Sequence, residues 1–435
     1  MSTNQRSDKP SNNEATNQLN ILLIHQYFLE DGDGGGSRWN EMCRMWNEDG
    51  HRITVLAGMV HYNSGLKAER YKGKFTFVDK KNDRLTVIRS HVSEAYNVSF
   101  LGRLWAYFSF VFSSLYAGFF KTRGKYDVII VTSPPLFVGI TAYFLSLFKR
   151  IPFVFEIRDL WPESAIDTGV LKNGLIIKMA FAFESFIYRK SKLINVLTPA
   201  FRSTLIENKQ VPANKVVLIP NAADFALSEE LLQTFDVEGF RKEHNLNNRF
   251  VITYVGAHGV ANHLIQAVDT AEILRKSHPE VLFLLIGEGM EKAMLKKEVE
   301  KRGIADSIRF IDAVPKKEVF KYILASDVGT SILKKVDTFK TVYSNKTFDY
   351  MSCKKPIFML IDGVSRELVE DAQCGEYIEP ENPQLFAQVI EKYLSQSVSL
   401  QKMGENGYAY AHLHFDREVL SEKYISIVKN VIGKK

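Results

Sequence analysis

The feature that most limits the fold of this sequence is a repeated alternation of short apolar runs with helical patterns. A first series, between residues 20 and 221, reads NILLIHQY, ITVLAG, LTVIRSH, YDVIIVTSP, PFVFEIRD, LINVLTP and KVVLIPN. A second series begins at residue 250 and reads FVITYVGAH, VLFLLIGEG, IRFIDAV, DVGTSIL, KPIFMLID and GEYIEP. Strands that alternate with helices are typical of parallel sheets in α/β proteins. The sequence therefore predicts two doubly wound, Rossmann-like domains in tandem.

The length of the chain agrees with two domains, because 435 residues exceed what one ordinary core accommodates. We expect a first domain over 19–222 and a second over 223–435, with the last helix packing back on the first domain. The polar, acidic stretch 224–248 predicts a linker that leads into a helix. Residues 1–18 contain almost nothing apolar, which predicts a disordered leader without the apolar core of a signal peptide.

Charge and cysteine content exclude some classes of function. The net charge of +6 is too small to indicate a nucleic-acid partner, but it suits an anionic ligand or a membrane surface. The three cysteines, Cys43, Cys353 and Cys374, are far apart and have no zinc-binding spacing. We expect them to be reduced, buried thiols of a cytosolic protein.

Two apolar segments of the first domain could touch a membrane. Residues 104–120 carry no charge and are flanked by Arg103, Lys121 and Arg123; residues 136–148 are also apolar. Seventeen residues are at the short limit for a membrane span, and strand-like YDVIIVTSPP follows directly, which disfavours a span. Buried helices of the α/β domain and a peripheral interface, with aromatic rings in lipid and cations at phosphates, both stay open.

In doubly wound sheets, ligands bind beyond the carboxyl ends of the strands, so the residues after each run are the candidates. Residues 25–37, HQYFLEDGDGGGS, follow the first run. Their glycines, with Ser37 as helix N-cap, would let backbone N–H groups approach a phosphate, although the spacing is not GxGxxG. A plain loop and a DxD metal site at Asp31 and Asp33 are the alternatives; no third oxygen ligand is evident for a metal.

Four ionisable groups surround a Trp-Pro turn in EIRDLWPES: Glu156, Arg158, Asp159 and Glu163. Such groups at a buried strand end are costly unless they are paired or functional. They therefore indicate either a catalytic loop or a structural Arg–Asp pair.

Three loops of the second domain are candidates too. In YVGAHGVANH, Gly256 and Gly259 permit close backbone approach and His258 could donate to a phosphate. In LIGEG, Glu288 lies between two glycines, where a simple turn is the alternative. In SNKTFDYM, Lys346 and Asp349 are three residues apart, hence on one helix face, which suits a phosphate and a ribose as well as a surface ion pair.

Together RDLWPES, IPNAAD, YVGAHG and SNKTFDYM…KKPI resemble glycosyltransferase family 4, a GT-B family, over nearly the whole chain from Asn20. The resemblance is closest to the bacterial branch that builds O-antigen, capsule and exopolysaccharide units. It implies a retaining transferase in which two Rossmann-like domains face a cleft. The implied donor is a nucleotide-diphosphate sugar, with UDP favoured, and no metal or cofactor takes part. The implied acceptor is a polyprenyl-diphosphate-linked saccharide at the inner face of the cell membrane, to which the cytoplasmic enzyme binds peripherally.

The resemblance also implies roles for individual residues. The implied donor-binding residues are Gly35, Gly36, Gly256, Glu288, Val314, Lys334 and Asp349. The implied catalytic residues are Arg158, Asp159, His258 and Lys346. In this scheme the glycines, His258 and Lys346 surround the diphosphate, the backbone at Val314 meets the base, and Asp349 holds the ribose.

Three departures separate this chain from the family pattern. The family's E-x7-E pair falls at Thr341 and Asp349, so the first carboxylate is missing. Ala257 and Asn262 stand where many relatives carry Arg and Lys. Arg158 precedes Asp159 where relatives often have His. The alternatives are therefore a non-catalytic nucleotide-sugar-binding scaffold of a glycan-assembly complex and a GT-B sugar-nucleotide epimerase.

Overall fold

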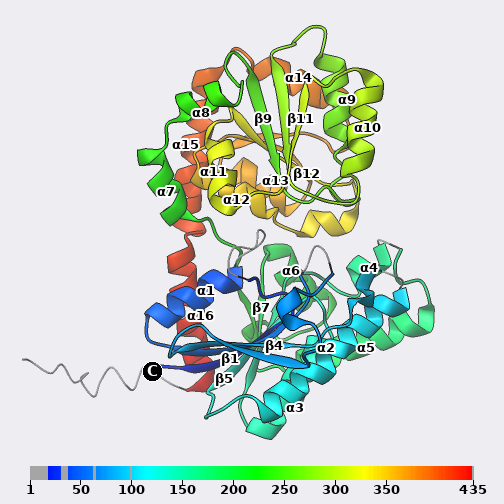
Figure 1. The fold of residues 1–435 in the computed structure, drawn as a ribbon, viewed down its shortest axis with the longest axis vertical. Helices are drawn as coiled ribbons and strands as arrows, with labels where there is room; N and C mark the ends of the chain where they lie inside the picture. The colour runs from blue at the N-terminus through cyan, green and yellow to red at the C-terminus, as the bar shows by residue number, and fades with distance from the viewer. Residues whose placement is uncertain (1–17, 31–37, 62–64, 98–99, 168, 434–435) are drawn as a thin grey trace, which may run out of the picture.

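The computed structural model describes residues 18–30, 38–61, 65–97, 100–167 and 169–433. The expected leader over 1–18 lies, except for Gln18, outside the described residues, as do the Ser37 cap and the DxD pair. Figure 1 shows two α/β units, one above the other, with the last helix running down to the first unit.

The first sheet has the strand order β3-β4-β2-β1-β5-β6-β7-β8, with only β3 antiparallel among its described pairings. Its strands are β1 (Asn20–His25), β2 (Arg52–Gly58), β3 (Thr76–Lys80), β4 (Leu85–Ser90), β5 (Val128–Ser133), β6 (Phe153–Ile157), β7 (Leu193–Val196) and β8 (Val216–Leu218). The helices among them are α1 (Arg38–Glu48), η1 (Glu69–Tyr71), η2 (Glu94–Asn97), α2 (Phe100–Phe120), α3 (Val138–Lys149), α4 (Glu163–Asp167), α5 (Gly174–Lys190), α6 (Pro199–Ser203), η3 (Thr204–Asn208) and η4 (Ala213–Lys215).

The second sheet is parallel in its described pairings, with the order β11-β10-β9-β12-β13-β14. Its strands are β9 (Phe250–Val255), β10 (Val281–Ile286), β11 (Ile308–Ile311), β12 (Val328–Ile332), β13 (Ile357–Leu360) and β14 (Gly375–Tyr377). The helices are α7 (Phe225–Thr234), α8 (Val237–Glu243), α9 (Ile265–Leu274), α10 (Lys292–Arg302), α11 (Lys316–Leu324), η5 (Asp337–Thr341), α12 (Asn345–Ser352), α13 (Val364–Asp371), α14 (Pro383–Tyr393), α15 (Ser397–His414) and α16 (Arg417–Ile432).

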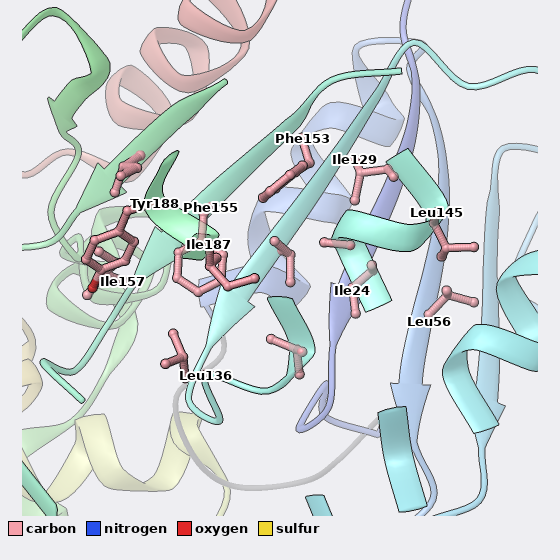
Figure 2. Packing of buried hydrophobic residues seen from close by; sticks show 14 of the residues in the cluster. Ile24, Leu56, Ile129, Leu136, Leu145, Phe153, Phe155, Ile157, Ile187 and Tyr188 are labelled. Atoms are coloured by element: carbon pink, nitrogen blue, oxygen red, sulfur yellow. The ribbon is translucent and has the colours of Figure 1, made fainter. Parts of the chain in front are cut away.

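Alternation along β1 divides the first domain into two apolar layers, since successive strand residues point to opposite faces. Leu22 and Ile24 pack with α2, α3 and α5 in one cluster, part of which Figure 2 shows. Ile21 and Leu23 pack on the other face with α1 and α16. The buried runs of the sequence are thus strands covered on both faces, which is usual for a parallel sheet.

The last helix, α16, completes the first domain. Its Tyr424 ring lies 5.6 Å from the ring of Trp39 and 5.5 Å from that of Trp46, both on α1. The indole of Trp46 also donates to the Ser421 carbonyl at 3.3 Å. The chain therefore crosses between the domains twice, once after β8 and once before α16.

The stretch 224–248 differs from the expected linker. It forms α7 and α8, capped by the side chains of Asp224 and Asp236. Phe225 and Leu231 of α7 are buried in the core of the second domain. The acidic side chains that suggested a linker are in part helix N-caps, which favour Asp.

The carboxyl edges of the two sheets face each other. Thr198, which follows β7, donates to the carbonyl of Thr341 in η5 at 2.7 Å. Thr338 of η5 donates to Asp167 of α4, in the first domain. Loops that follow strands in both sheets therefore meet, as a site between the domains requires.

Within the described residues, no helix is long and apolar enough to cross a membrane. The three cysteines are buried, free thiols.

Candidate active site

The ionisable side chains of EIRDLWPES in the first domain are of two kinds. Some are bound by structural partners, and the others lie at the edge of the sheet. Glu156 is fully buried in β6 and accepts hydrogen bonds from Trp39, Thr132 and Asn195 at 3.0–3.2 Å. It also forms an ion pair with Arg38 at 3.2 Å. This carboxylate is bound by four residues from three elements, α1, β5 and β7, so its role is structural.

The Glu163 carboxylate is also bound within the first domain. Lys209 lies 2.5 Å from one carboxylate oxygen of Glu163 and 2.5 Å from one of the buried Glu184. Burial raises the pKa of Glu184, and Lys209 offsets part of this effect. One lysine thus ties α4, where Glu163 begins the helix, to α5.

Arg158 and Asp159 stay at the edge of the sheet, directly after β6. The Ser164 hydroxyl donates to Asp159 Oδ2 at 2.7 Å. Burial raises the pKa of Asp159, and the nearby charge of Glu163 raises it further. The charge of Arg158 also acts on His25, at the end of β1. Burial, followed by the charges of Arg158 and Arg89, lowers the pKa of His25 well below its ordinary value. A cation and a carboxyl of raised proton affinity therefore lie together at this strand end.

In the second domain, the loops after β9 and β10 are bound to each other through their backbones. The His258 N–H donates to the Glu288 carbonyl at 2.8 Å, and the Glu291 N–H donates to the His258 carbonyl at 2.9 Å. A Cβ on Gly287, whose φ is +144°, would lie 2.0 Å from the Gly256 carbonyl oxygen. Gly287 is therefore required by the contact between the loops, whether or not a ligand is bound.

The His258 side chain does not supply positive charge at neutral pH. It is fully buried, and neither ring nitrogen has a hydrogen-bond partner among the described residues. Burial, followed by the charge of Lys292, lowers the pKa of His258 to about 4. A neutral imidazole can donate one N–H at most, so His258 stays a predicted hydrogen-bond donor to the diphosphate and not a source of positive charge.

Glu288 is paired with a lysine that sequence reasoning missed. The ammonium of Lys292 lies 2.7 Å from Glu288 and 2.6 Å from Asp312, and it donates to the Gly287 carbonyl at 2.9 Å. The spacing of four residues between Glu288 and Lys292 is the signal that could have revealed the pair. This cluster joins the loops after β10 and β11.

Lys346 forms no ion pair among the described residues. Its Nζ lies 4.6 Å from the centre of the Tyr254 ring and 3.4 Å from the Ser344 hydroxyl. Among the described residues, no carboxylate oxygen lies within 4 Å of it. A Cβ on Gly256 would be 3.2 Å from Lys346 Cε, so the lysine lies over this glycine. Burial lowers its pKa to about 8, and Asp349 opposes part of that shift.

Asp349, one turn further along α12, lies in a field of mixed charge. Burial raises its pKa, while Lys316 and Arg417 act in the opposite direction. Val314 lies two residues before Lys316, in the loop between β11 and α11, and is partly buried. Lys346, Asp349 and the Val314 loop therefore belong to one edge of the second sheet.

Two further predicted positions are engaged by backbone contacts. The Lys334 N–H, after β12, donates to the Ala261 carbonyl at 2.9 Å. The Thr341 hydroxyl donates to the Thr338 carbonyl at 2.6 Å. Neither contact blocks a ligand, but Thr341 offers no carboxylate where the resemblance places one. Gly35 and Gly36 lie outside the described residues.

No metal-binding cluster is evident in the part of the chain that the structure describes: it contains no group of three or more His, Cys, Asp or Glu side chains that could hold a metal ion.

Comparison with known proteins gives this geometry a family context. The chain is 26% identical over 305 residues to WcaI of Escherichia coli (strain K12), described as a colanic acid biosynthesis glycosyl transferase. The aligned part covers 68% of this chain and 74% of WcaI. It is 21% identical over 267 residues to the alpha-D-kanosaminyltransferase of Streptomyces kanamyceticus, covering 61% of this chain and 67% of that enzyme.

Solved structures share the fold at lower identity. HepE of Anabaena in complex with UDP superposes with a TM-score of 0.68 at 16% identity, covering 95% of this chain and 100% of HepE. WaaG, a glycosyltransferase involved in lipopolysaccharide biosynthesis, superposes with a TM-score of 0.68 at 14% identity, covering 94% of this chain and 99% of WaaG. The fold is therefore GT-B, as the sequence predicted.

Two family models match consecutive parts of the chain. The model described as Glycosyl transferase 4-like domain matches residues 33–222, and that described as Glycosyl transferases group 1 matches residues 236–410. The chain is thus built of a glycosyl transferase 4-like domain followed by a glycosyl transferase group 1 domain.

Proposed function

We propose that this chain is a retaining glycosyltransferase of bacterial surface polysaccharide synthesis. It moves a sugar from a nucleotide-diphosphate sugar, a UDP-sugar, to a polyprenyl-diphosphate-linked saccharide. The observation that carries the proposal is Lys346, a partly buried ammonium beside Gly256 with no anionic partner among the described residues. A diphosphate is a ligand that supplies the missing charge. The complexes of HepE with UDP and with UDP-glucose support the choice of UDP.

The proposed chemistry depends on charge that develops on the leaving group. As the glycosidic bond breaks, the diphosphate gains negative charge, which Lys346 and backbone N–H groups of the second domain stabilise. One such preorganised group contributes about 3–4 kcal/mol. The acceptor hydroxyl attacks from the face that the diphosphate leaves, and the diphosphate takes its proton. No protein nucleophile is needed, and as the resemblance implies, no metal or further cofactor takes part.

The first domain contributes Arg158 and Asp159 to this scheme. Both follow β6 at the edge that faces the second domain. Arg158 orients the donor sugar, while Asp159 accepts a hydrogen bond from the attacking hydroxyl. The Ser164 hydroxyl, 2.7 Å from Asp159, fixes the orientation of that carboxyl group.

An apolar face on the first domain supports an acceptor in a membrane. Helices α2 and α3 are in contact through Phe119 and Phe148, whose ring centres are 4.8 Å apart, and α3 contacts α5 through Tyr143 and Phe186 at 5.0 Å. The large exposed apolar side chains of these helices are Leu101, Trp105, Phe112, Tyr116, Phe120, Phe144, Leu147, Phe148, Leu175, Ile176 and Met179.

The charge around this apolar face is positive. Residues 100–150 contain six Lys and Arg against one acidic residue, Asp127, so this stretch alone carries +5 of the chain's net +6. Apolar side chains that enter lipid, with cations at the phosphates, are the usual composition of a peripheral membrane surface. In the proposal, this face holds the cytoplasmic enzyme at the inner side of the cell membrane, where its lipid-linked acceptor is found.

A thermal-shift series with UDP, GDP, ADP, TDP and CDP tests the nucleotide site, because a bound ligand raises the melting temperature by mass action. Transfer from the matching nucleotide sugar to a polyprenyl-diphosphate-linked saccharide then tests the reaction. Lys346→Ala should lower turnover at least a hundredfold. Lys402→Ala, which changes an exposed lysine on α15, is the matched control. Normal turnover in the Lys346 variant would refute the assignment.

Thr341 favours one competing function, a non-catalytic scaffold that binds a nucleotide sugar. Its position lacks the carboxylate, and its carbonyl is engaged by Thr198 of the other domain. Tight UDP binding with no transfer or hydrolysis in the presence of acceptor would support the scaffold instead.

A further inference from the structure

The two crossings between the domains lie side by side. The Ala223 N–H donates to the Phe415 carbonyl at 2.9 Å, and Ala223 pairs with Asp416 as an isolated parallel bridge. We call residues 219–224 and 415–416 the hinge. A change in the angle between the domains has to bend both strands of this hinge together.

Arg38, the first residue of α1, holds the first strand of the hinge. Its guanidinium donates to the Pro220 carbonyl at 2.5 Å and to the Ile219 carbonyl at 3.1 Å, and it pairs with Glu156 at 3.2 Å. The Arg38 side chain is 7% exposed. A planar guanidinium can satisfy these three acceptors at once, whereas an ammonium cannot reach them in the same geometry.

The Arg38 side chain is itself fixed by the acceptors around it. Glu156 is oriented by three other donors, described above. Asn195, one of those donors, also accepts from the Ile219 N–H at 2.9 Å through its side-chain oxygen. The start of the hinge is therefore bound through both a carbonyl and an N–H to one buried network. Such networks contribute more to a unique geometry than to stability.

Arg417, the first residue of α16, directly follows the second strand and binds the end of the first. Its guanidinium lies 3.0 Å from Asp224 at the far end of the first hinge strand and 3.9 Å from Glu41 of α1. Lys316 pairs with Asp224 from the second domain. Burial alone would raise the pKa of Asp224, but Arg417 and Lys316 hold it below its ordinary value, so the carboxylate is charged.

We propose that Arg38 and Arg417 are positioning residues, which set the angle between the domains by binding both hinge strands to α1. Neither arginine is proposed to contact the donor or the acceptor, although the charge of Arg417 lowers the pKa of Asp349. Their effect on transfer rests on the proposed function, because only a reaction between the domains depends on that angle. The geometry of the hinge itself does not depend on it.

The first experiment measures the hinge without any ligand. Spin labels on cysteines introduced at Asp83 and Lys301, both exposed and in different domains, report the distance between the domains. We expect the distance distribution to broaden or shift in Arg38→Lys and in Arg417→Gln. Arg44→Gln is the matched control, because Arg44 is an exposed arginine of α1 that pairs only within its own helix in the described contacts. Parent-like distributions in both hinge variants would overturn the proposal.

Loss of folding would not end the test. If Arg38→Lys does not fold, the double variant Arg38→Met/Glu156→Gln removes the charge from both sides of the buried pair, which such sites tolerate better than the loss of one partner. The same broadening is expected there, and an unchanged distribution would count against the proposal.

The second experiment separates binding from turnover. UDP affinity should change less than threefold in Arg38→Lys, because Arg38 lies outside the proposed nucleotide site of the second domain, while turnover falls at least tenfold. Equal losses of UDP affinity and turnover would overturn a positioning role. If the parent protein itself turns over no UDP-sugar, the proposed function fails, and the distance measurement still decides the role of the hinge.

Discussion

Replacing Lys346 with Met is expected to stabilise the protein while abolishing nucleotide binding. Burial lowers the pKa of this lysine from 10.5 to about 8. Each pKa unit corresponds to about 1.4 kcal/mol, so keeping Lys346 protonated in the folded state costs about 3 kcal/mol, reduced by its partial exposure to solvent. A methionine of similar length removes this cost and keeps the contact with the Tyr254 ring.

The cost of protonated Lys346 makes the stability of the protein depend on pH. Because the folded-state pKa is below the unfolded value, the unfolded chain binds more protons between about pH 8 and pH 10.5. The stability of the parent should therefore rise with pH across this window, whereas below it the cost of Lys346 is at its largest and does not change with pH. The variant lacks that rise, so the advantage of Lys346→Met over the parent should be largest near pH 7 and vanish near pH 10.5.

Melting temperatures of parent and variant at pH 7, 8.5 and 10, with and without UDP, check both effects. Taking the difference between the two proteins cancels the titration of their common groups. We expect UDP to raise the melting temperature of the parent and leave the variant unchanged, and Lys402→Met to behave like the parent. A variant that is less stable than the parent at pH 7, or that still responds to UDP, would refute the reasoning.

Three other changes test separate parts of the molecule. Asp159→Asn should lower turnover at least a hundredfold and change UDP affinity less than twofold, as isothermal titration with kinetics will measure; an equal loss of affinity would place Asp159 in the nucleotide site. Phe148→Glu should weaken flotation with anionic liposomes severalfold at low salt, because a charge replaces an exposed apolar ring, whereas Val398→Glu in the second domain should not. Gly287→Ala should lower the free energy of unfolding by at least about 2 kcal/mol, because the added Cβ is strained and clashes with the Gly256 carbonyl. Gly174→Ala, where an added Cβ meets no atom within 4 Å, should leave the free energy of unfolding unchanged.

Much of the fold could be predicted because buried parallel strands are continuous apolar runs. Each run of the two series corresponds to a strand of the structure. The edge strand Thr76–Lys80 was missed, since it is only partly buried and three of its five residues, TFVDK, are polar. The stretch 224–248 was predicted as a linker that leads into a helix, whereas helix begins already at Phe225; capping aspartates resemble the acidic residues of a linker.

The candidate site was harder to predict, because a side chain's role depends on partners that lie far away in the sequence. Glu156 and Asp159 belong to the same short motif, yet one is saturated by donors from α1, β5 and β7 and the other lies at the edge. Likewise, Lys346 and Lys292 each have a carboxylate three or four residues away in the sequence, Asp349 and Glu288, yet of the two lysines only Lys292 forms ion pairs among the described residues.

The packing of α16 against α1 has a consequence for synthesis on the ribosome. One face of the first sheet, with Trp39 and Trp46, is covered by residues 417–432. About 210 residues separate the end of the first sheet from the end of α16, and translation at about 5–20 residues per second takes roughly 10–40 s to cover them. During that interval the nascent first domain exposes an apolar surface, which makes it a natural substrate for chaperones until the last helix emerges and binds.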